Sequence, residues 1–201
     1  MTMRMGIVVF DGFDVIDAGG PYEVFLTASR LRERAGEPAL FEVEMLSPGA
    51  RDVTAFGGMT LTGLGDAQAA NGLDVVVIPG TIDIDKAMAD DELIEAVAQI
   101  AAQSKLRTSV CTGAFLLARA GLLEGLDATT HWEDVSALAN ERVRAAIEGV
   151  RWVDAGDVVT SGGLTSGMHM ALHVVERLAD RALAEATARQ LDLVWSPQPR
   201  A

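Results

Sequence analysis

The chain has 201 residues, of which 49% are hydrophobic, and its 29 acidic and 16 basic side chains give a formal net charge of −13. This acidic excess argues against a nucleic-acid-binding surface, and no apolar run approaches the roughly 20 residues that cross a bilayer. A single cysteine excludes an internal disulfide and suits a reducing, cytoplasmic location. We therefore expect one α/β domain over residues 1–201, with a peripheral tail from about residue 194.

The first half of the chain alternates strand and helix patterns. Continuous apolar runs, typical of strands buried on both faces, predict strands at 5–10, 41–46 and 73–78. Apolar residues at helical spacing predict a helix at 22–34, with Pro21 in its first turn. The stretch 51–64 alternates around two adjacent glycines, as in a β-hairpin. A further helix is expected at about 90–104, where an aspartate can cap its first turn.

The second half begins with a strand that stops at the only cysteine. Thr108 and Val110 favour a strand at 106–110, and the residues from Ala114 favour a helix that ends near Gly121. Further strands are expected at 127–130, 150–154 and 157–160. Further helices are expected at 133–140, 164–178 and 183–193. Strands that alternate with helices predict a mostly parallel sheet covered by helices on both faces.

The junction at Cys111 is the strongest candidate for a reactive site. Ser109 and Gly113, two residues to either side, are small enough for a sharp strand-to-helix turn like the nucleophile elbow of hydrolases. The positive end of the following helix would favour a thiolate. The alternative is that Cys111 is an ordinary core residue, as most free cysteines are.

Other candidate residues follow strands elsewhere in the chain. In open α/β sheets ligands bind outside the carboxyl ends of the strands. Asp17, Gly80, Cys111 and His131 each end or follow a predicted strand, so we expect them to converge on one rim. Asp17 has an alternative role as a helix cap ahead of Pro21.

A set of motifs spans about residues 4–193. It comprises DVIDAGGP at 14–21, VIPG at 77–80, SVCTGA at 109–114, AGLL at 120–123, ATTHW at 128–132 and TSGGLTSG at 160–167. Together the motifs resemble the DJ-1/PfpI superfamily, above all its branch of isocyanide (isonitrile) hydratases and amidotransferase-like sensor domains. The resemblance implies a flavodoxin-like three-layer sandwich, usually a homodimer, with a nucleophilic cysteine on a strained elbow.

The resemblance also implies roles for individual residues. Cys111 matches the nucleophile and Asp17 its acidic partner, which is aspartate in the hydratases and glutamate in DJ-1 and the PfpI proteases. Thr112 follows the cysteine as in the hydratases, whereas PfpI-type peptidases have histidine there. Thr81 replaces a glycine of many relatives, so a positive φ at this position would strain it or require a differently shaped loop.

The implied reaction is the addition of water to an isocyanide, a small-molecule electrophile, without a cofactor. Cys111 would attack the terminal carbon to form a thioimidate, and Asp17 would move the proton. Backbone N–H groups of Gly80, Thr81 and Thr112 would stabilise developing charge, with the Thr112 hydroxyl near the sulfur. Because a carboxylate repels a thiolate, we expect a raised pKa for Asp17 and a lowered pKa for Cys111.

Several side chains keep two interpretations. Gly163, in a Ser-Gly-Gly turn, would either help to hold an anion or substrate or allow close packing beside the site. His131 would either tune the thiolate or make a structural hydrogen bond. Glu133 and Asp134 are expected to be solvated.

His169 and His173 have metal-ligand spacing on one helical face, but no further ligand motif accompanies them. We therefore predict no metal site, and no dinucleotide fingerprint is present.

Two other functions stay open. One is a sensor or stress-response protein that uses Cys111 for a redox response without catalysis. The other is a different cysteine enzyme of the superfamily, such as a glyoxalase or an amidase.

Overall fold

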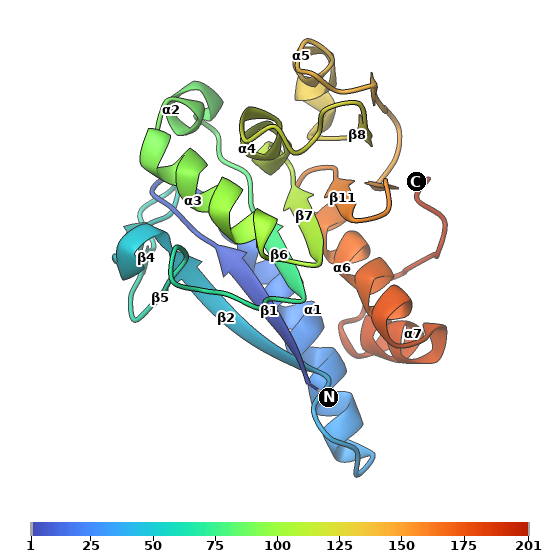
Figure 1. The fold of residues 1–201 in the computed structure, drawn as a ribbon. Coiled ribbons are helices and arrows are strands. Elements are labelled where there is room, and N and C mark those ends of the chain that lie inside the picture. Colours follow the sequence, from blue (N-terminus) through green and yellow to red (C-terminus); the bar gives the residue numbers. More distant parts are fainter. Residues whose placement is uncertain (1, 201) are drawn as a thin grey trace.

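The computed structural model describes residues 2–200; Met1 and Ala201, the ends of the expected domain, lie outside the described residues. Its centre is one seven-stranded sheet (Figure 1). The strands of this sheet are β1 (Met3–Val8), β2 (Phe41–Ser47), β5 (Gly65–Asp66), β6 (Val75–Ile78), β7 (Leu106–Val110), β10 (Trp152–Asp154) and β11 (Val158–Ser161). They lie in the order β10-β11-β7-β6-β1-β2-β5. Only β10 and β11 pair antiparallel, which confirms the predicted mostly parallel sheet.

Two small sheets lie outside the central one. An antiparallel hairpin of β3 (Val53–Thr54) and β4 (Thr60–Leu61) confirms the hairpin predicted for residues 51–64. A parallel pair joins β8 (Asp127–Ala128) to β9 (Ala145–Ala146).

Helices cover both faces of the central sheet, as predicted. They are α1 (Val15–Arg34), α2 (Ile84–Met88), α3 (Asp91–Ala102), α4 (Gly113–Arg119), α5 (Val135–Leu138), α6 (Thr165–Leu178) and α7 (Arg181–Gln190), with 3-10 turns η1 (Pro48–Ala50) and η2 (Trp132–Asp134). Helices α1, α6 and α7 pack together on one face, and α3 and α4 pack on the other (Figure 1). The side chains of β6, between these layers, have no exposed surface. None of the helices within residues 2–200 is both long enough and apolar enough to span a bilayer.

The start of α1 differs from the sequence-based prediction. The helix begins at Val15 instead of Tyr22, because the Asp14 carboxylate caps it by accepting from the Ile16 N–H at 3.3 Å. Pro21 therefore lies inside the helix, where it has no N–H to donate to the Asp17 carbonyl. The earlier start makes Asp14 the cap and places Asp17 in the first turn.

Two other segments also differ. The helix expected at 133–140 is shortened to η2 followed by the single turn of α5. The sequence reading did not predict α2, although Asp83 caps it by accepting from the Lys86 N–H at 3.1 Å.

Three neighbouring strands end together at one edge of the sheet. Ile7 pairs with Val77, and Val77 pairs with Thr108, so β1, β6 and β7 are in register near their carboxyl ends. The loops that follow are tied to one another: Phe13 and Thr81 form an isolated bridge, and the Asp14 N–H donates to the Gly80 carbonyl at 2.8 Å. This edge therefore brings loops from separate parts of the chain into fixed positions.

Gly113 fixes the distance between α4 and the loop after β6. A Cβ at Gly113 would lie 2.2 Å from the Ile78 carbonyl oxygen, and backbone cannot move aside as a side chain can. We expect Gly113→Ala to lower the free energy of unfolding by at least about 2 kcal/mol, measured by urea denaturation.

The matched control is Gly19→Ala within α1, where a Cβ would meet nothing within 4 Å. It should raise stability by about 0.5–1 kcal/mol, because alanine favours a helix. Equal stability of the two variants would show that α4 is not closely packed on the Ile78–Pro79 backbone.

Candidate active site

Cys111 occupies the strained turn that its sequence context predicts. Its φ is +56°, a conformation uncommon for residues other than glycine. The backbone is held on both sides: the Cys111 N–H donates to the Ser161 carbonyl at 3.1 Å, and its carbonyl accepts from the Thr130 hydroxyl at 2.8 Å. The residue is 8% exposed. These hydrogen bonds fix the backbone of the turn and so the position of the thiol.

Asp17 is completely buried in the first turn of α1. Its Oδ2 accepts from the Gly80 N–H at 3.1 Å, and its Oδ1 accepts from the Leu164 N–H at 3.0 Å. Burial, followed by the negative charge of Asp14, raises the pKa of Asp17 to about 7. The predicted rise in the pKa of Asp17 is thus confirmed.

The prediction of a lowered pKa for Cys111 is wrong. Burial, followed by the charge of Asp17, raises the pKa of the thiol to about 12. The Thr112 N–H acts in the opposite direction, but a single donor does not offset the loss of hydration. Thiol and carboxyl group titrate as a pair, which loses one proton near neutrality and holds the second into strong alkali. Above pH 7, therefore, the state is a neutral thiol beside an ionised carboxylate.

Two N–H groups of the loop after β6 already have partners within the site. The Gly80 N–H donates to Asp17, and the Thr81 N–H donates to the Thr112 Oγ at 2.8 Å. The Thr112 hydroxyl in turn donates to the Thr81 carbonyl at 2.7 Å, so it is directed at this loop instead of the sulfur. In this structure, therefore, neither N–H group is free for the oxyanion role expected of it, and that role stays a prediction.

Glycine is required at the first position of this loop and not at the second. A Cβ at Gly80 would lie 2.7 Å from both Asp17 Oδ2 and Thr112 Oγ, and 2.8 Å from the Cβ of Cys111. Thr81 is not among the described residues with positive φ, so it carries no such strain. Its hydroxyl donates to the Gly12 carbonyl at 2.9 Å.

Gly163 and His131 form another wall beside the sulfur. A Cβ at Gly163 would lie 2.4 Å from the His131 Cδ2 and 3.3 Å from the Cys111 Sγ. His131 Nδ1 lies 3.6 Å from a carboxylate oxygen of Glu133 and 3.6 Å from one of Asp134. The two acids, expected to be solvated, thus stand beside the imidazole at the mouth of the site.

A cavity of about 370 Å³ opens above the thiol. Its lining comprises Asp14, Thr81, Ile82, Ile84, Cys111, Thr112, His131, Glu133, Asp134 and Leu164. Apolar side chains and three carboxylates surround the sulfur, and no Lys or Arg is among them. Such a site suits a small neutral or cationic molecule better than an anion.

Sequence reasoning missed two residues that act on Asp17. Leu164 donates its N–H to the carboxylate from a backbone with φ +57°, and Asp14 adds a negative charge nearby. Asp14 lies three residues before Asp17, which was a usable signal. Nothing in the local pattern pointed to the Leu164 N–H, since it reaches Asp17 from 147 residues away.

The two helical histidines of α6 have separate surroundings. His173 Nε2 lies 2.7 Å from Asp154 Oδ2, and its ring stacks on Trp152 with centroids 5.1 Å apart. His169 is buried, and burial lowers its pKa. Within residues 2–200, no cluster of three or more potential metal ligands includes either of them.

This fold is shared with known proteins. The profile of the DJ-1/PfpI family matches residues 3–177. The chain belongs to the DJ-1/PfpI family. A THiJ/PfpI family protein from Pseudomonas syringae superposes with a TM-score of 0.85 at 27% identity, over 98% of this chain and 77% of that one. Drosophila melanogaster DJ-1beta superposes with a TM-score of 0.80 at 17% identity, over 97% of this chain and 100% of that one, which supports the flavodoxin-like fold.

Curated relatives of this DJ-1/PfpI protein include an enzyme and transcriptional regulators. An isonitrile hydratase of Pseudomonas putida is 30% identical over 99% of this chain and 81% of that protein. The HTH-type transcriptional regulator GbdR of Pseudomonas aeruginosa is 31% identical over 90% of this chain. The match spans about half of the regulator, 48% of its length.

The protonation of the pair predicts how Cys111 reacts with iodoacetamide. Because only the thiolate reacts, the rate in the wild type should rise about tenfold per pH unit, without a plateau below pH 10. Asp17→Asn should lower the apparent pKa of the thiol by about one unit or more, since it removes the adjacent charge. Intact-mass spectrometry measures the rate directly, because the chain has only one cysteine.

Cys111→Ser is the control and should take up no label. A wild-type plateau below about pH 8, the range of a free thiol, would contradict the assignment of the proton to sulfur.

Proposed function

We propose that the protein is a cofactor-independent isocyanide hydratase-like lyase, which converts R–N≡C and water into an N-formamide. The observation that carries this proposal is a thiol that lines a small cavity, with the buried carboxylate of Asp17 directly beside it. The relation to an isonitrile hydratase over nearly the whole chain supports it. In this proposal Cys111 and Asp17 are the catalytic residues.

The first step uses the neutral thiol beside the ionised carboxylate. Asp17 removes the proton of the Cys111 thiol while the sulfur forms a bond to the terminal carbon of the isocyanide. Asp17 then delivers the same proton to that carbon, which gives the thioimidate R–N=CH–S–Cys. Because one carboxylate both accepts and donates this proton, no free thiolate needs to accumulate.

The second step adds water to the thioimidate carbon. Asp17 accepts a proton from the water as the carbon–oxygen bond forms, and that proton passes to the nitrogen, which gives R–NH–CH(OH)–S–Cys. The carbon–sulfur bond then breaks, the hydroxyl proton returns through Asp17 to the sulfur, and R–NH–CHO leaves. Substrate and water together contain all atoms of the product, so the reaction requires no oxidant or reductant.

The remaining site residues position this pair in the proposal. Gly80 and Thr112 hold the loop against Asp17, and the Thr112 N–H faces the sulfur. Gly163 allows the backbone to approach the thiol. His131 lies against Gly163 in the same wall beside the sulfur.

A sensor without catalysis is the second candidate, favoured by the similarity to regulators such as GbdR. A redox response at Cys111 fits poorly, because oxidation proceeds through the thiolate and burial keeps this thiol protonated. A sensor of this fold would instead respond to a bound small molecule. A glyoxalase or amidase would act through the same two residues on a different electrophile.

The expected homodimer belongs to the proposal as well. Ile16 and Leu164 are large apolar residues, 38% and 42% exposed, near the starts of α1 and α6. Helices α1 and α6 pack against each other, so one partner surface could cover both residues. Light scattering at assay concentration measures the mass directly.

The hydratase predicts formamide from alkyl isocyanides with the purified protein. Cys111→Ser should abolish the reaction, and Asp17→Asn should lower kcat by about 10²–10⁴-fold, because the proton carrier is lost. Product is measured by chromatography, with methylglyoxal and simple amides as alternative substrates. If the protein turned over methylglyoxal but no isocyanide, the hydratase proposal would be wrong and a glyoxalase function would take its place.

The pH profile of kcat/KM should report the first ionisation of the pair. Activity should rise through an inflection near pH 7, where Asp17 ionises, and stay high to at least about pH 10. Asp14→Asn should shift the inflection to lower pH, because the charge of Asp14 raises the pKa of Asp17. Asparagine caps a helix as well as aspartate does, so α1 should be preserved. An inflection that stays in place or moves to higher pH would contradict the assignment.

A further inference from the structure

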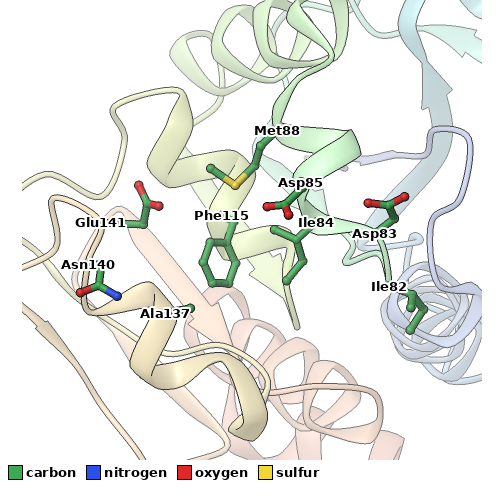
Figure 2. Close-up of a pocket in the computed structure, with 9 residues that line it drawn as sticks. All are labelled: Ile82, Asp83, Ile84, Asp85, Met88, Phe115, Ala137, Asn140 and Glu141. Atoms are coloured by element: carbon green, nitrogen blue, oxygen red, sulfur yellow. The ribbon is translucent and has the colours of Figure 1, made fainter.

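A second hollow of about 450 Å³ adjoins the catalytic cavity. Its lining comprises Ile82, Asp83, Ile84, Asp85, Met88, Phe115, Ala137, Asn140 and Glu141. Figure 2 shows Phe115 between Ile84, Asp85 and Met88 on one side and Ala137, Asn140 and Glu141 on the other. We call this space the distal hollow. Ile82 and Ile84 line both the distal hollow and the catalytic cavity.

The distal hollow and the catalytic cavity are enclosed by the same two segments of the chain. The segment 82–88, which contains α2, forms one wall of both, and the segment 133–141 forms the other. Helix α4 runs beneath them, with Thr112 at the catalytic end and Phe115 at the distal end. Three residues along a helix advance about 5 Å. The distal hollow is therefore a short continuation of the catalytic cavity.

Another hollow, of about 650 Å³, lies against the other side of the α2 segment. It shares Thr81 and Ile82 with the catalytic cavity, but the rest of its lining includes Phe10, Phe56 and Leu93, from segments that do not line that cavity. Because these residues belong to other segments, only the distal hollow continues between the walls of the catalytic cavity.

The chemistry of the distal hollow is apolar at its floor and acidic at its rim. Phe115 is 3% exposed and is accompanied by Ile84 and Met88. Asp85 and Glu141 stand on opposite walls (Figure 2), and the lining contains no Lys or Arg. An apolar chain would be stabilised here because its surface is removed from water. A positive charge at its end would meet carboxylates from both walls.

We propose that the distal hollow binds the substituent R of the substrate, and that R is a short apolar chain that ends in a cation such as a primary ammonium. This inference rests on the proposed hydratase function, to which it adds the substrate class. Asp85 and Glu141 are the residues that select the charge, and Ile84, Met88 and Phe115 contact the chain.

The test compares n-hexyl isocyanide with 6-aminohexyl isocyanide as substrates. The wild type should prefer the ammonium compound by about fivefold in kcat/KM, the effect of two partly exposed charge pairs. The double variant Asp85→Asn/Glu141→Gln should lower this ratio to less than half its wild-type value, because it removes two of the three carboxylates of the lining. Added salt should lower the ratio in the wild type as well.

The matched control is Asp90→Asn, which removes one carboxylate from the hollow on the other side of α2. Asparagine can still cap α3, so the preference should remain. Equal kcat/KM for both substrates in the wild type, or a preference lost equally in Asp90→Asn, would overturn the inference while the hydratase stands.

A binding measurement separates the inference from the proposed function. Calorimetry with hexylamine and with 1-hexanol on Cys111→Ser protein requires no turnover. If hexylamine binds, and binds more weakly to the protein that also carries Asp85→Asn/Glu141→Gln, the result supports a cation-binding site. This holds even if the protein turns over no isocyanide. Equal binding of the two probes, or no binding of either, contradicts it.

Discussion

A carboxyl group buried without a cation beside a buried thiol is the constraint on which the site depends. Asp17 has no exposed surface, and an isolated charge there would be strongly unfavourable. Two backbone N–H groups, from Gly80 and Leu164, compensate its charge. The Cys111 thiol is a third hydrogen-bond donor to the carboxylate and stabilises its charge further. The thiol and the carboxylate thus stabilise each other in the resting state.

The backbone around this pair is built for close approach. Segments that are distant in the sequence meet within a few ångströms of the sulfur, and they can do so only where a side chain is absent. Gly80, Gly113 and Gly163 each leave a space in which a Cβ would collide with the site or with the backbone behind it. The positive φ of Cys111 completes the arrangement by turning its side chain toward that space. Strain at this turn is maintained because hydrogen bonds hold the backbone on both sides.

Much of the fold and of the site could be predicted from the sequence. The features that could not be predicted depend on burial or on contacts between distant segments. Buried parallel strands and helices have strong periodicities, so the sheet and the elbow at Cys111 were evident. The predicted start of α1 was too late because Pro21 is typical of a helix's first turn. The helix in fact begins seven residues earlier, where the Asp14 carboxylate caps it. The pKa of the thiol was predicted in the wrong direction. The sequence around Cys111 indicates a helix whose dipole would lower that pKa, but it does not show that the thiol is buried, which raises it. The donor at Leu164 comes from a distant segment and leaves no local signal.

The location of the shared proton is the central claim, and infrared spectroscopy of the S–H stretch tests it most directly. The single cysteine makes the band unambiguous. At pH 8 we expect an S–H band that disappears in Cys111→Ser, together with an ionised carboxylate at Asp17. An absent S–H band at pH 8, with a protonated carboxyl band that is lost in Asp17→Asn, would place the proton on the acid and contradict the account.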